Sequence, residues 1–324
     1  MNVICTSAGR RTSLIRDFKT AIDSSGTVWA GDMDPLAPAL QVAHSSIILP
    51  PVNAPEYIPR LLDHAREFDI DFVVPLIDTE LRQLAEAHSD FASEGCEVVV
   101  SDSDLLDIAH DKWKTVKHFS SIGVGTPQSW LPNESSPHDW PDPVFVKPRH
   151  GSASSGACSV PREKSLSVIR EIESPIVQEV ITAPEITIDA LFGLEGTLIH
   201  YVPRLRIRTL AGESIQGRTL PDTDLGSWLR PILREVGTLG ARGPITLQAF
   251  LTEPTPTLSE INARFGGGFP LTKAAGGHYP SWIMQMHNGH SIEPRLGEYT
   301  VDLCMTRAYT EWFIDMGAAK EDRR

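Results

Sequence analysis

Glu260 and Asn262, followed by Arg264 and three glycines, are the residues of this chain whose types and spacing point most directly to chemistry. Because Ile261 separates them, a strand would direct both polar side chains to one face and Ile261 into the core. Carboxylate and amide oxygens suit a hard cation such as Mg²⁺, and a neighbouring arginine suits a phosphate or an acyl phosphate. The glycines at 266–268 would let the backbone pass close to a bound group. Taken alone, the stretch also fits an exposed hairpin arm with a flexible loop.

A further oxygen ligand is predicted on the strand that precedes this stretch. Residues 245–251 form an apolar run, which a turn containing Pro254 joins to residues 257–261. If the two runs pair as antiparallel strands across a tight turn, Gln248 lies opposite Glu260. The sequence therefore predicts that Gln248, Glu260 and Asn262 share one cation.

A lysine at the end of another strand indicates an anion-binding element. Residues 144–148 read as a strand that carries Lys147, and a run of small residues follows at 151–156. A fixed ammonium group, with backbone and hydroxyl donors behind it, suits phosphate. A small-residue loop alone is usually a flexible hairpin, so the prediction depends on the preceding lysine.

Three arginines alternate along one segment, at positions 204, 206 and 208. In a strand all three would project from the same face. A solvated basic edge that deters strand pairing is one interpretation. Because the chain has a formal net charge of −13, three aligned arginines favour an anion site instead.

The first hundred residues alternate between strand and helix patterns, which predicts βαβ units and a parallel sheet. Ligands gather at the carboxyl ends of such strands. Arg10 and Arg11 follow the first strand, and Asp78 and Glu80 follow the fourth. The loop at 7–13 could hold an anion on its backbone amides at a helix N-terminus, or Arg10 and Arg11 are solvated surface charges. Asp78 and Glu80 are either a substrate contact or the polar start of a helix. The first loop lacks a dinucleotide-binding G-x-G-x-x-G pattern, so no NAD site is expected.

The periodicity of apolar residues predicts the remaining elements. Strands are expected at 2–6, 28–30, 47–49, 72–76, 96–100, 144–148, 157–160, 175–181, 186–192, 197–202, 245–251 and 257–261. Helices are expected at 14–22, 57–68, 79–92, 165–172, 225–239 and 279–288, with another starting at Lys112. A turn is expected at 269–276, and a final strand or two within 300–314.

The bulk properties are those of a globular protein with two or three subdomains. At 324 residues the chain exceeds one ordinary core, and its negative charge argues against a nucleic-acid-binding role. The four cysteines are far apart and show no metal-ligand spacing, so a reduced, cytoplasmic setting is expected. We expect no membrane partner, because no apolar run is long enough to span a bilayer and the N-terminus shows no signal pattern.

In their order and spacing these signals resemble the ATP-grasp superfamily, in its carbamoyl-phosphate-synthetase-like group. The resemblance runs through Asp111-Lys112, Val146-Lys147-Pro148 with its loop, and Gln178 to Ile181 with Glu185 and Asp189. It continues through the arginine segment and Gln248 to the stretch Glu260–Gly268. It implies a parallel α/β domain at 1–108, which carries the substrate side. An ATP-grasp fold of two parts would follow, with a small lid at 109–182 and a metal-binding part at 183–324.

The resemblance also implies the nucleotide contacts. Lys112 and Lys147 would contact the ATP phosphates, and Glu185 would hold the ribose hydroxyls. The loop over the phosphates would contribute Gly151, Ser152, Ser154, Ser155 and Gly156. The adenine would lie against Gln178, Glu179, Val180 and Ile181. Ala183-Pro184 departs from the family pattern, which usually has a glycine before the ribose glutamate.

The remaining implied roles concern the metal and the substrate. Gln248, Glu260 and Asn262 would bind Mg²⁺, as two ions and with Mn²⁺ as an alternative. Gln248 is a neutral ligand where some family members have a carboxylate. Arg264 would stabilise the transferred phosphoryl group, with Arg204 and Arg206 as partners for phosphate or the substrate carboxylate. The carboxylate pocket would be bordered by Arg10, Arg11, Asp78, Glu80, Gly267 and Gly268.

The chemistry expected is ATP-dependent ligation of a carboxylate to an amine through an acyl phosphate, with ADP and phosphate released. Phosphoryl transfer needs alignment and charge neutralisation more than covalent help, which lysines, an arginine and Mg²⁺ supply. The alternatives are a thiol as the nucleophile, phosphotransfer to carbamate or another small carboxylate, and a non-catalytic nucleotide-binding module. The partners expected are small-molecule carboxylates and amines, with a homodimer as the assembly if the chain associates.

Overall fold

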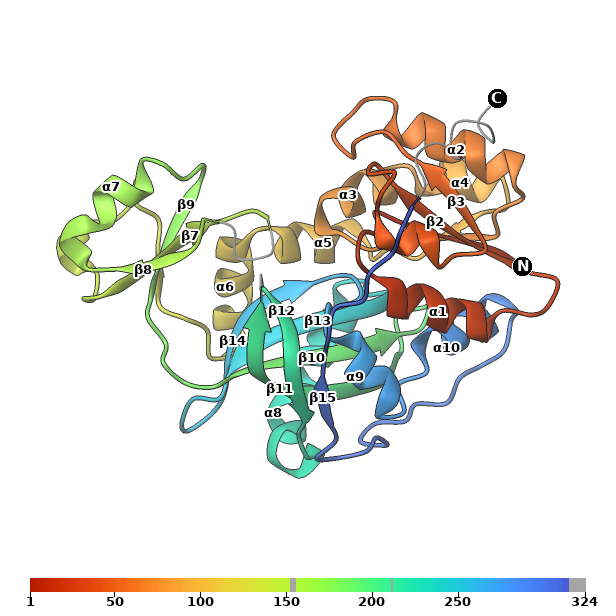
Figure 1. Ribbon diagram of the computed structural model, residues 1–324. Coiled ribbons are helices and arrows are strands. Elements are labelled where there is room, and N and C mark those ends of the chain that lie inside the picture. The colour runs from red at the N-terminus through yellow and green to blue at the C-terminus, as the bar shows by residue number, and fades with distance from the viewer. Residues whose placement is uncertain (152–155, 211, 315–324) are drawn as a thin grey trace.

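The computed structural model describes residues 1–151, 156–210 and 212–314, and Figure 1 shows three β-sheets within them. The sheets have five, four and six strands. They lie at residues 2–98, 129–179 and 185–306 of the chain. In the described residues, no helix combines the length and the apolar character needed to cross a membrane.

The N-terminal sheet is parallel throughout, as the alternating pattern predicts. Its strands run in the order β3-β2-β1-β4-β5. They are β1 (Asn2–Thr6), β2 (Thr27–Asp32), β3 (Ser45–Ile48), β4 (Phe72–Pro75) and β5 (Glu97–Val98). The intervening helices are α1 (Thr12–Ala21), η1 (Pro38–Gln41), α2 (Tyr57–Glu67), α3 (Asp78–Glu86) and α4 (His88–Ser93). The central strands are almost wholly buried, because helices and the rest of the chain cover both faces.

A four-stranded antiparallel sheet stands apart from the rest of the chain, at the left of Figure 1. Its order is β6-β9-β7-β8, and α5 and α6 lead into it. Its strands are β6 (Ser129–Trp130), β7 (Val144–Pro148), β8 (Cys158–Val160) and β9 (Pro175–Glu179). The helices are α5 (Ser103–His110), α6 (Lys112–Ser121), η2 (Pro137–Asp139), η3 (Arg162–Lys164) and α7 (Ser165–Ile169). It has its own small core, around Trp140, Val144, Val146 and Val177.

The third sheet is antiparallel and carries most of the polar residues considered above. Its order is β14-β13-β10-β11-β12-β15. The strands are β10 (Glu185–Phe192), β11 (Leu198–Leu210), β12 (Glu213–Thr219), β13 (Gly243–Phe250), β14 (Thr257–Asn262) and β15 (Cys304–Thr306). Helices α8 (Asp222–Thr238), α9 (Phe269–Ala274) and α10 (Tyr279–His287) belong to the same region.

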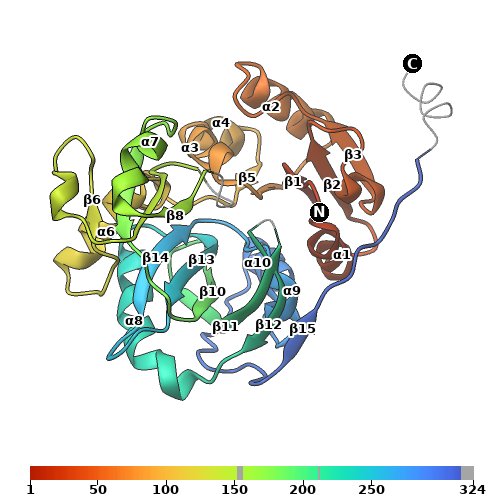
Figure 2. The ribbon, with the colours of Figure 1, turned by 60° about the vertical axis from the view of Figure 1, so that its left-hand side comes forward.

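The N-terminal sheet and the six-stranded sheet share their apolar cores. One core joins Ile4, Tyr57 and Phe91 to Ile188 and Ile261, which lie in the other sheet. A second core joins residues of α1 to Phe265, Phe269 and Tyr279. Figure 2 shows α1 beside α9 and α10, where helices of the two regions meet. The two regions therefore form one packed body, with the four-stranded sheet attached to it.

Two predictions of secondary structure were wrong. The single helix expected at 79–92 is two helices, α3 and α4, which meet at Ala87. The turn expected at 269–276 contains the helix α9, with Pro270 in its first turn. Proline is favoured there because the first-turn N–H groups have no helical partner. Within the described part of the tail, the final strand is the short β15.

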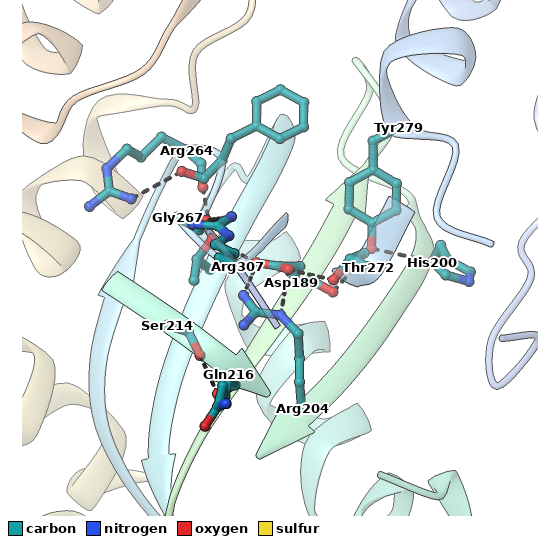
Figure 3. A network of polar contacts seen from close by, with 12 residues as sticks. Asp189, His200, Arg204, Ser214, Gln216, Arg264, Gly267, Thr272, Tyr279 and Arg307 are labelled. Atoms are coloured by element: carbon teal, nitrogen blue, oxygen red, sulfur yellow. Dashed lines mark hydrogen bonds and ion pairs between the residues drawn. The ribbon is translucent and has the colours of Figure 1, made fainter. Parts of the chain in front are cut away.

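A buried ion pair fixes the centre of the six-stranded sheet (Figure 3). Arg204 on β11 donates from Nε and Nη2 to the two carboxylate oxygens of Asp189 on β10, at 2.8 and 3.0 Å. Both side chains are at most 3% exposed. Thr272 of α9 donates to the same carboxylate, and the Tyr279 hydroxyl of α10 donates to the Asp189 carbonyl at 3.0 Å. The pair thus connects two strands with the helices beside them.

Breaking this pair should be costly. We expect Asp189→Asn to lower the free energy of unfolding by about 3–5 kcal/mol, because it leaves the Arg204 guanidinium buried without a countercharge. Asp302→Asn, which breaks the exposed Arg218–Asp302 pair at 3.3 Å, is the control and should cost about 0–1 kcal/mol. Urea unfolding followed by circular dichroism measures both, and equal losses would contradict the structural role of the buried pair.

Candidate functional site

A cavity of about 370 Å³ lies between the four-stranded sheet and the six-stranded sheet. Apolar and charged side chains from both sheets line it. The lining includes Lys112, Phe145, Lys147, His150, Gly151, Gln178, Glu179, Val180, Ile181, Glu185, Gln248, Phe250 and Glu260. The structure therefore brings together most of the residues that the sequence assigned to a nucleotide.

The two lysines reach this cavity from different elements. Lys112 opens α6, and its Nζ donates to the Gly151 carbonyl at 2.6 Å. Asp111 caps the same helix and accepts from Nε of Arg149 at 3.1 Å, so the start of α6 is tied to the strand end that follows Lys147. Burial, reinforced by the charge of Lys112, lowers the pKa of Lys147 to about 8, although Glu260 and Glu185 oppose the shift.

The small-residue loop after Lys147 lies only in part within the described residues. Gly151 lines the cavity and has a φ of +89°, which favours glycine. Gly156 has a φ of +72° and lies against Pro148. Ser152, Ser154 and Ser155 lie outside the described residues, so their expected phosphate contacts stay predictions.

The adenine and ribose candidates lie where the strand β9 ends and β10 begins. Gln178 is buried and donates to the Ser129 hydroxyl at 2.8 Å, while the Glu179 carboxylate accepts from the Gln128 backbone at 2.8 Å. Glu185 forms an ion pair with Arg206. Burial raises the pKa of the Glu185 carboxyl despite this arginine. Arg206 also donates to Gln248 Oε1 at 3.2 Å and so joins the ribose candidate to the metal candidates.

The expected metal ligands lie on two paired strands. Gln248 of β13 is the direct antiparallel partner of Glu260 on β14, as the sequence predicts. Among the described residues, the Glu260 carboxylate has no hydrogen-bond or ion-pair partner, although it faces the cavity. Asn262 is buried, and its Oδ1 accepts from Arg264 Nη2 at 3.0 Å.

This set of donors fits Mg²⁺. An unpaired carboxylate beside amide oxygens is a hard-ligand set, and Mg²⁺ is usually held by one or two carboxylates, with phosphate and water completing its shell. In the described parts of the chain no three His, Cys, Asp or Glu residues form a metal-binding group. Any ion here would therefore depend on Glu260 and on the nucleotide itself.

A second cavity, of about 230 Å³, begins where the first one ends. Gln248 and Glu260 line both. The other lining residues include Arg10, Arg11, Asp78, Arg204, Arg206, Glu213, Arg264, Gly266, Gly267 and Gly268. All but one of the arginines and acids that the sequence assigned to catalysis or substrate thus meet around this space. The exception is Glu80. Arg208, the third of the aligned arginines, is exposed and lies outside the cavity lining.

Arg264 and Asp78 are partners of each other in this cavity. Arg264 donates from Nε and Nη2 to Asp78 Oδ2, at 2.9 and 2.6 Å. Asp78 opens α3, so the pair holds the N-terminal region against the glycine stretch. Asp78 lines the cavity while its Oδ2 holds the Arg264 guanidinium, so its expected contact with a substrate stays a prediction.

Of the two interpretations of Glu80, a substrate contact or the polar start of a helix, the structure supports the second, because Glu80 lies in the first turn of α3. It is 0% exposed, and it accepts hydrogen bonds from the backbone N–H of Leu76 and Ile77 at 2.8 and 3.1 Å. The hydroxyls of Ser7 and Tyr57 also donate to it. Burial raises its pKa. Glu80 therefore fixes the loop that presents Asp78, rather than lying against a ligand.

The glycines near Arg264 are required by close packing. Gly268 lies against the Arg204 guanidinium, which a Cβ would overlap, and Gly266 lies against Asp189 and Thr246. Arg204 donates to Asp189 from Nε and Nη2. Its expected contact with a substrate carboxylate would therefore have to use Nη1.

Arg11 lines this cavity and, among the described residues, has no carboxylate within ion-pair distance. Its Nη1 donates to the Phe265 carbonyl at 3.4 Å. Burial and the neighbouring Arg264 lower its pKa to about 10, against the opposing charge of Glu213. An anion bound in this cavity would relieve that destabilisation.

Sequence reasoning missed two charged residues of the site, Glu213 and Arg307. Glu213 begins β12, and Arg307 follows β15. Neither belongs to a motif, because β15 reaches the site only by pairing with β12. Arg307 donates to the Gly267 carbonyl, as Figure 3 shows.

Two family models match this chain. The model described as PylC-like, N-terminal domain, matches residues 3–99. The model described as ATP-grasp domain matches residues 109–268, which include every residue expected to bind nucleotide or metal.

One curated protein is also similar to this chain in sequence. A D-alanine–D-alanine ligase of Corynebacterium urealyticum is 30% identical over 145 aligned positions, which cover 38% of this chain and 40% of the ligase. The chain thus matches less than half of that relative's length.

Among solved structures, the biotin carboxylase domain of the Hydrogenobacter thermophilus 2-oxoglutarate carboxylase, in complex with MgADP, ADP and bicarbonate, has a TM-score of 0.75. It is 14% identical and covers 94% of this chain, or 73% of its own. The L-amino acid ligase of Bacillus licheniformis has a TM-score of 0.66 at 18% identity, covering 88% of this chain and 73% of its own. At these identities the likeness shows the shared fold.

The lowered pKa of Lys147 generates a test by pH. Bound phosphates favour the ammonium form, so nucleotide affinity should be full below pH 8 and fall as the pH rises through the Lys147 pKa of about 8. The expected loss approaches tenfold per pH unit above that value. Calorimetric titration of ADP with Mg²⁺ between pH 7 and 9.5 measures it. Lys147→Arg, which stays charged, should bind with little pH dependence, and an unchanged slope in this variant would refute the assignment.

Proposed function

This chain belongs to the ATP-grasp superfamily, and on that premise we propose that it activates a carboxylate with ATP and joins it to an amine. The observation that carries the proposal is the shared border of the two cavities at Gln248 and Glu260. A nucleotide in the first cavity would point its phosphates at that border, and a carboxylate in the second cavity would meet them there.

The proposed reaction has two balanced steps. A carboxylate oxygen attacks the γ-phosphorus of ATP, the bond from that phosphorus to the bridging oxygen breaks, and ADP leaves. The amine nitrogen then attacks the acyl carbon, a C–N bond forms, and the C–O bond to phosphate breaks. Inorganic phosphate leaves with the electron pair, and the nitrogen loses a proton. Neither step needs a protein nucleophile.

The side chains around the border supply position and charge. Lys112 and Lys147 would hold the phosphates on one side, and Arg264 would neutralise the transferred group on the other. Asp78 keeps the Arg264 guanidinium in place, so it acts through Arg264. Arg11 and Arg206 would orient the substrate carboxylate, because a fixed guanidinium fork matches that group.

The metal role rests on the same border. Gln248, Glu260 and Asn262 would hold Mg²⁺, which when bound to ATP spreads the negative charge of the phosphates. Because this set contains a single carboxylate, we propose that oxygens of the ATP phosphates supply further ligands to the ion. The division into 1–108, 109–182 and 183–324 belongs to the same proposal, with the nucleotide held between the second and third parts.

A screen of products tests the reaction class. The protein, ATP and Mg²⁺ are incubated with a panel of carboxylates crossed with a panel of amines, and the nucleotide and phosphate products are separated. We expect one combination to release ADP and inorganic phosphate in equal amounts. AMP with pyrophosphate would refute acyl-phosphate ligation. ADP release with a carboxylate alone, and a stable phosphorylated product, would indicate phosphotransfer instead.

A neutral substitution at Glu260 tests the site. Because Glu260 has no partner among the described residues, Glu260→Gln should leave thermal unfolding unchanged while lowering the ADP-release rate by roughly 10²–10³-fold. Arg264→Met should lower the rate similarly but also destabilise the fold, since it strands Asp78. Glu195→Gln, on the exposed hairpin before β11, is the matched control. Normal turnover in Glu260→Gln would sink the assignment.

A further inference from the structure

A third cavity, of about 470 Å³, continues from the second one toward the C-terminal segment. The two share Arg10, Arg11, Glu213, Gly266 and Gly267. The third cavity has no lining residue in common with the nucleotide cavity. A molecule that occupied it would therefore reach the activated carboxylate from the side opposite the nucleotide.

The C-terminal segment forms one wall of this space. Pairing between β12 and β15 continues as the backbone N–H of Arg307 donates to the Ile215 carbonyl at 2.9 Å. The chain then runs beside α1, as both ribbon views show, and brings Tyr309 and Trp312 to the cavity. Backbone hydrogen bonds to β12 therefore hold the start of this segment against the cavity.

The charges of the cavity are unbalanced among the residues described there. Four arginines line it, at 10, 11, 16 and 307, against the single carboxylate of Glu213. Glu213 lies 3.8 Å from Arg10 and 3.6 Å from Arg307, which are ion-pair distances beyond hydrogen-bond length. Both Glu213 and Arg307 therefore keep capacity for a ligand. Burial lowers the pKa of Arg307, so an anion beside it would be stabilising.

The remainder of the wall is apolar. Leu14, Ile215, Phe269, Pro270 and Trp312 line the space. A ligand that fits must therefore carry charge at one end and an apolar group at the other.

We propose that this third cavity is the amine subsite, and that it takes a zwitterionic amine with an apolar side chain. Glu213, which borders both cavities, holds the ammonium group next to the acyl site. Arg307 holds the carboxylate, and the apolar group lies against Trp312 and Ile215. An ammonium and a carboxylate borne by one carbon match an acid and an arginine that lie side by side. This inference rests on the proposed ligase function and names the class of its second substrate.

Hydroxylamine allows the carboxylate substrate to be tested without the amine substrate. It traps an acyl phosphate as a hydroxamate and is too small to need the subsite, so it first identifies the carboxylate. Leucine and phenylalanine are then compared with isoamylamine and phenethylamine, which lack the carboxylate. We expect the amino acids to have a higher kcat/KM by about 10- to 100-fold, the range for one hydrogen bond to a charged group. Equal use of the decarboxylated amines would overturn the proposal.

Variants then locate the subsite. Arg307 lines the third cavity but not the second, so Arg307→Met should raise the KM for the amine by about 10- to 100-fold, while hydroxamate formation and the KM for ATP stay within about twofold. Glu213→Gln should raise the KM for the amine by a similar factor. Arg218→Met, on the same strand β12 and paired with the exposed Asp302, is the control and should change neither. If hydroxamate formation fell as much as use of the amine, the proposal would be overturned, because the third cavity would then bind the carboxylate substrate.

A binding measurement keeps the two proposals distinguishable. If no carboxylate gives a hydroxamate with the unmodified protein, the ligase proposal fails. Calorimetric titration with leucine and phenylalanine then decides the subsite by itself. Saturable binding that is lost in Arg307→Met supports it, and no binding to the unmodified protein overturns it.

Discussion

The register between β13 and β14 is the constraint on which the site depends. It places Gln248 opposite Glu260 and leaves this carboxylate at the border of two cavities. A slip of one residue would turn both side chains to the other face of the sheet, into the apolar core that Leu247 and Ile261 now fill. Burying the polar side chains of Gln248 and Glu260 would be unfavourable, and this stabilises the observed register. The packing of the sheet therefore also positions the proposed metal ligands.

Around that border most of the arginines are matched to acids. Arg204 pairs with Asp189, Arg206 with Glu185, and Arg264 with Asp78, each across different elements. Such pairs keep planar cations fixed in a chain whose net charge is −13. Fixed charge is what phosphoryl transfer requires, since a preorganised site need not reorganise as the reaction proceeds.

Local patterns predicted most of the fold and the centre of the site, and they failed where distant segments meet. Strand alternation gave the parallel sheet, and the short turn between two apolar runs gave the pairing of Gln248 with Glu260. The partnership of Arg264 with Asp78 joins residues 186 positions apart, so no local pattern contains it. Glu80 was expected to border the substrate pocket, because no local pattern shows that its buried partner, the Tyr57 hydroxyl, comes from another helix. Arg307 was missed because the strand that places it at the site, β15, is only three residues long and has no clear sequence pattern. The turn expected at 269–276 was wrong because its apolar residues pack as a helix against α1 and β12.

The shared apolar cores give the chain a property that its family boundaries conceal. The two matched domains end and begin near residue 100, yet their side chains interleave in both large cores. A fragment cut there would expose the surface that each half now buries against the other, and neither half would keep its full stability alone. The boundaries of the family models therefore do not coincide with the boundaries of the packed cores. The two matched regions share their cores and should unfold as one cooperative unit, and the four-stranded sheet, with its own core, is the part left to unfold or move independently.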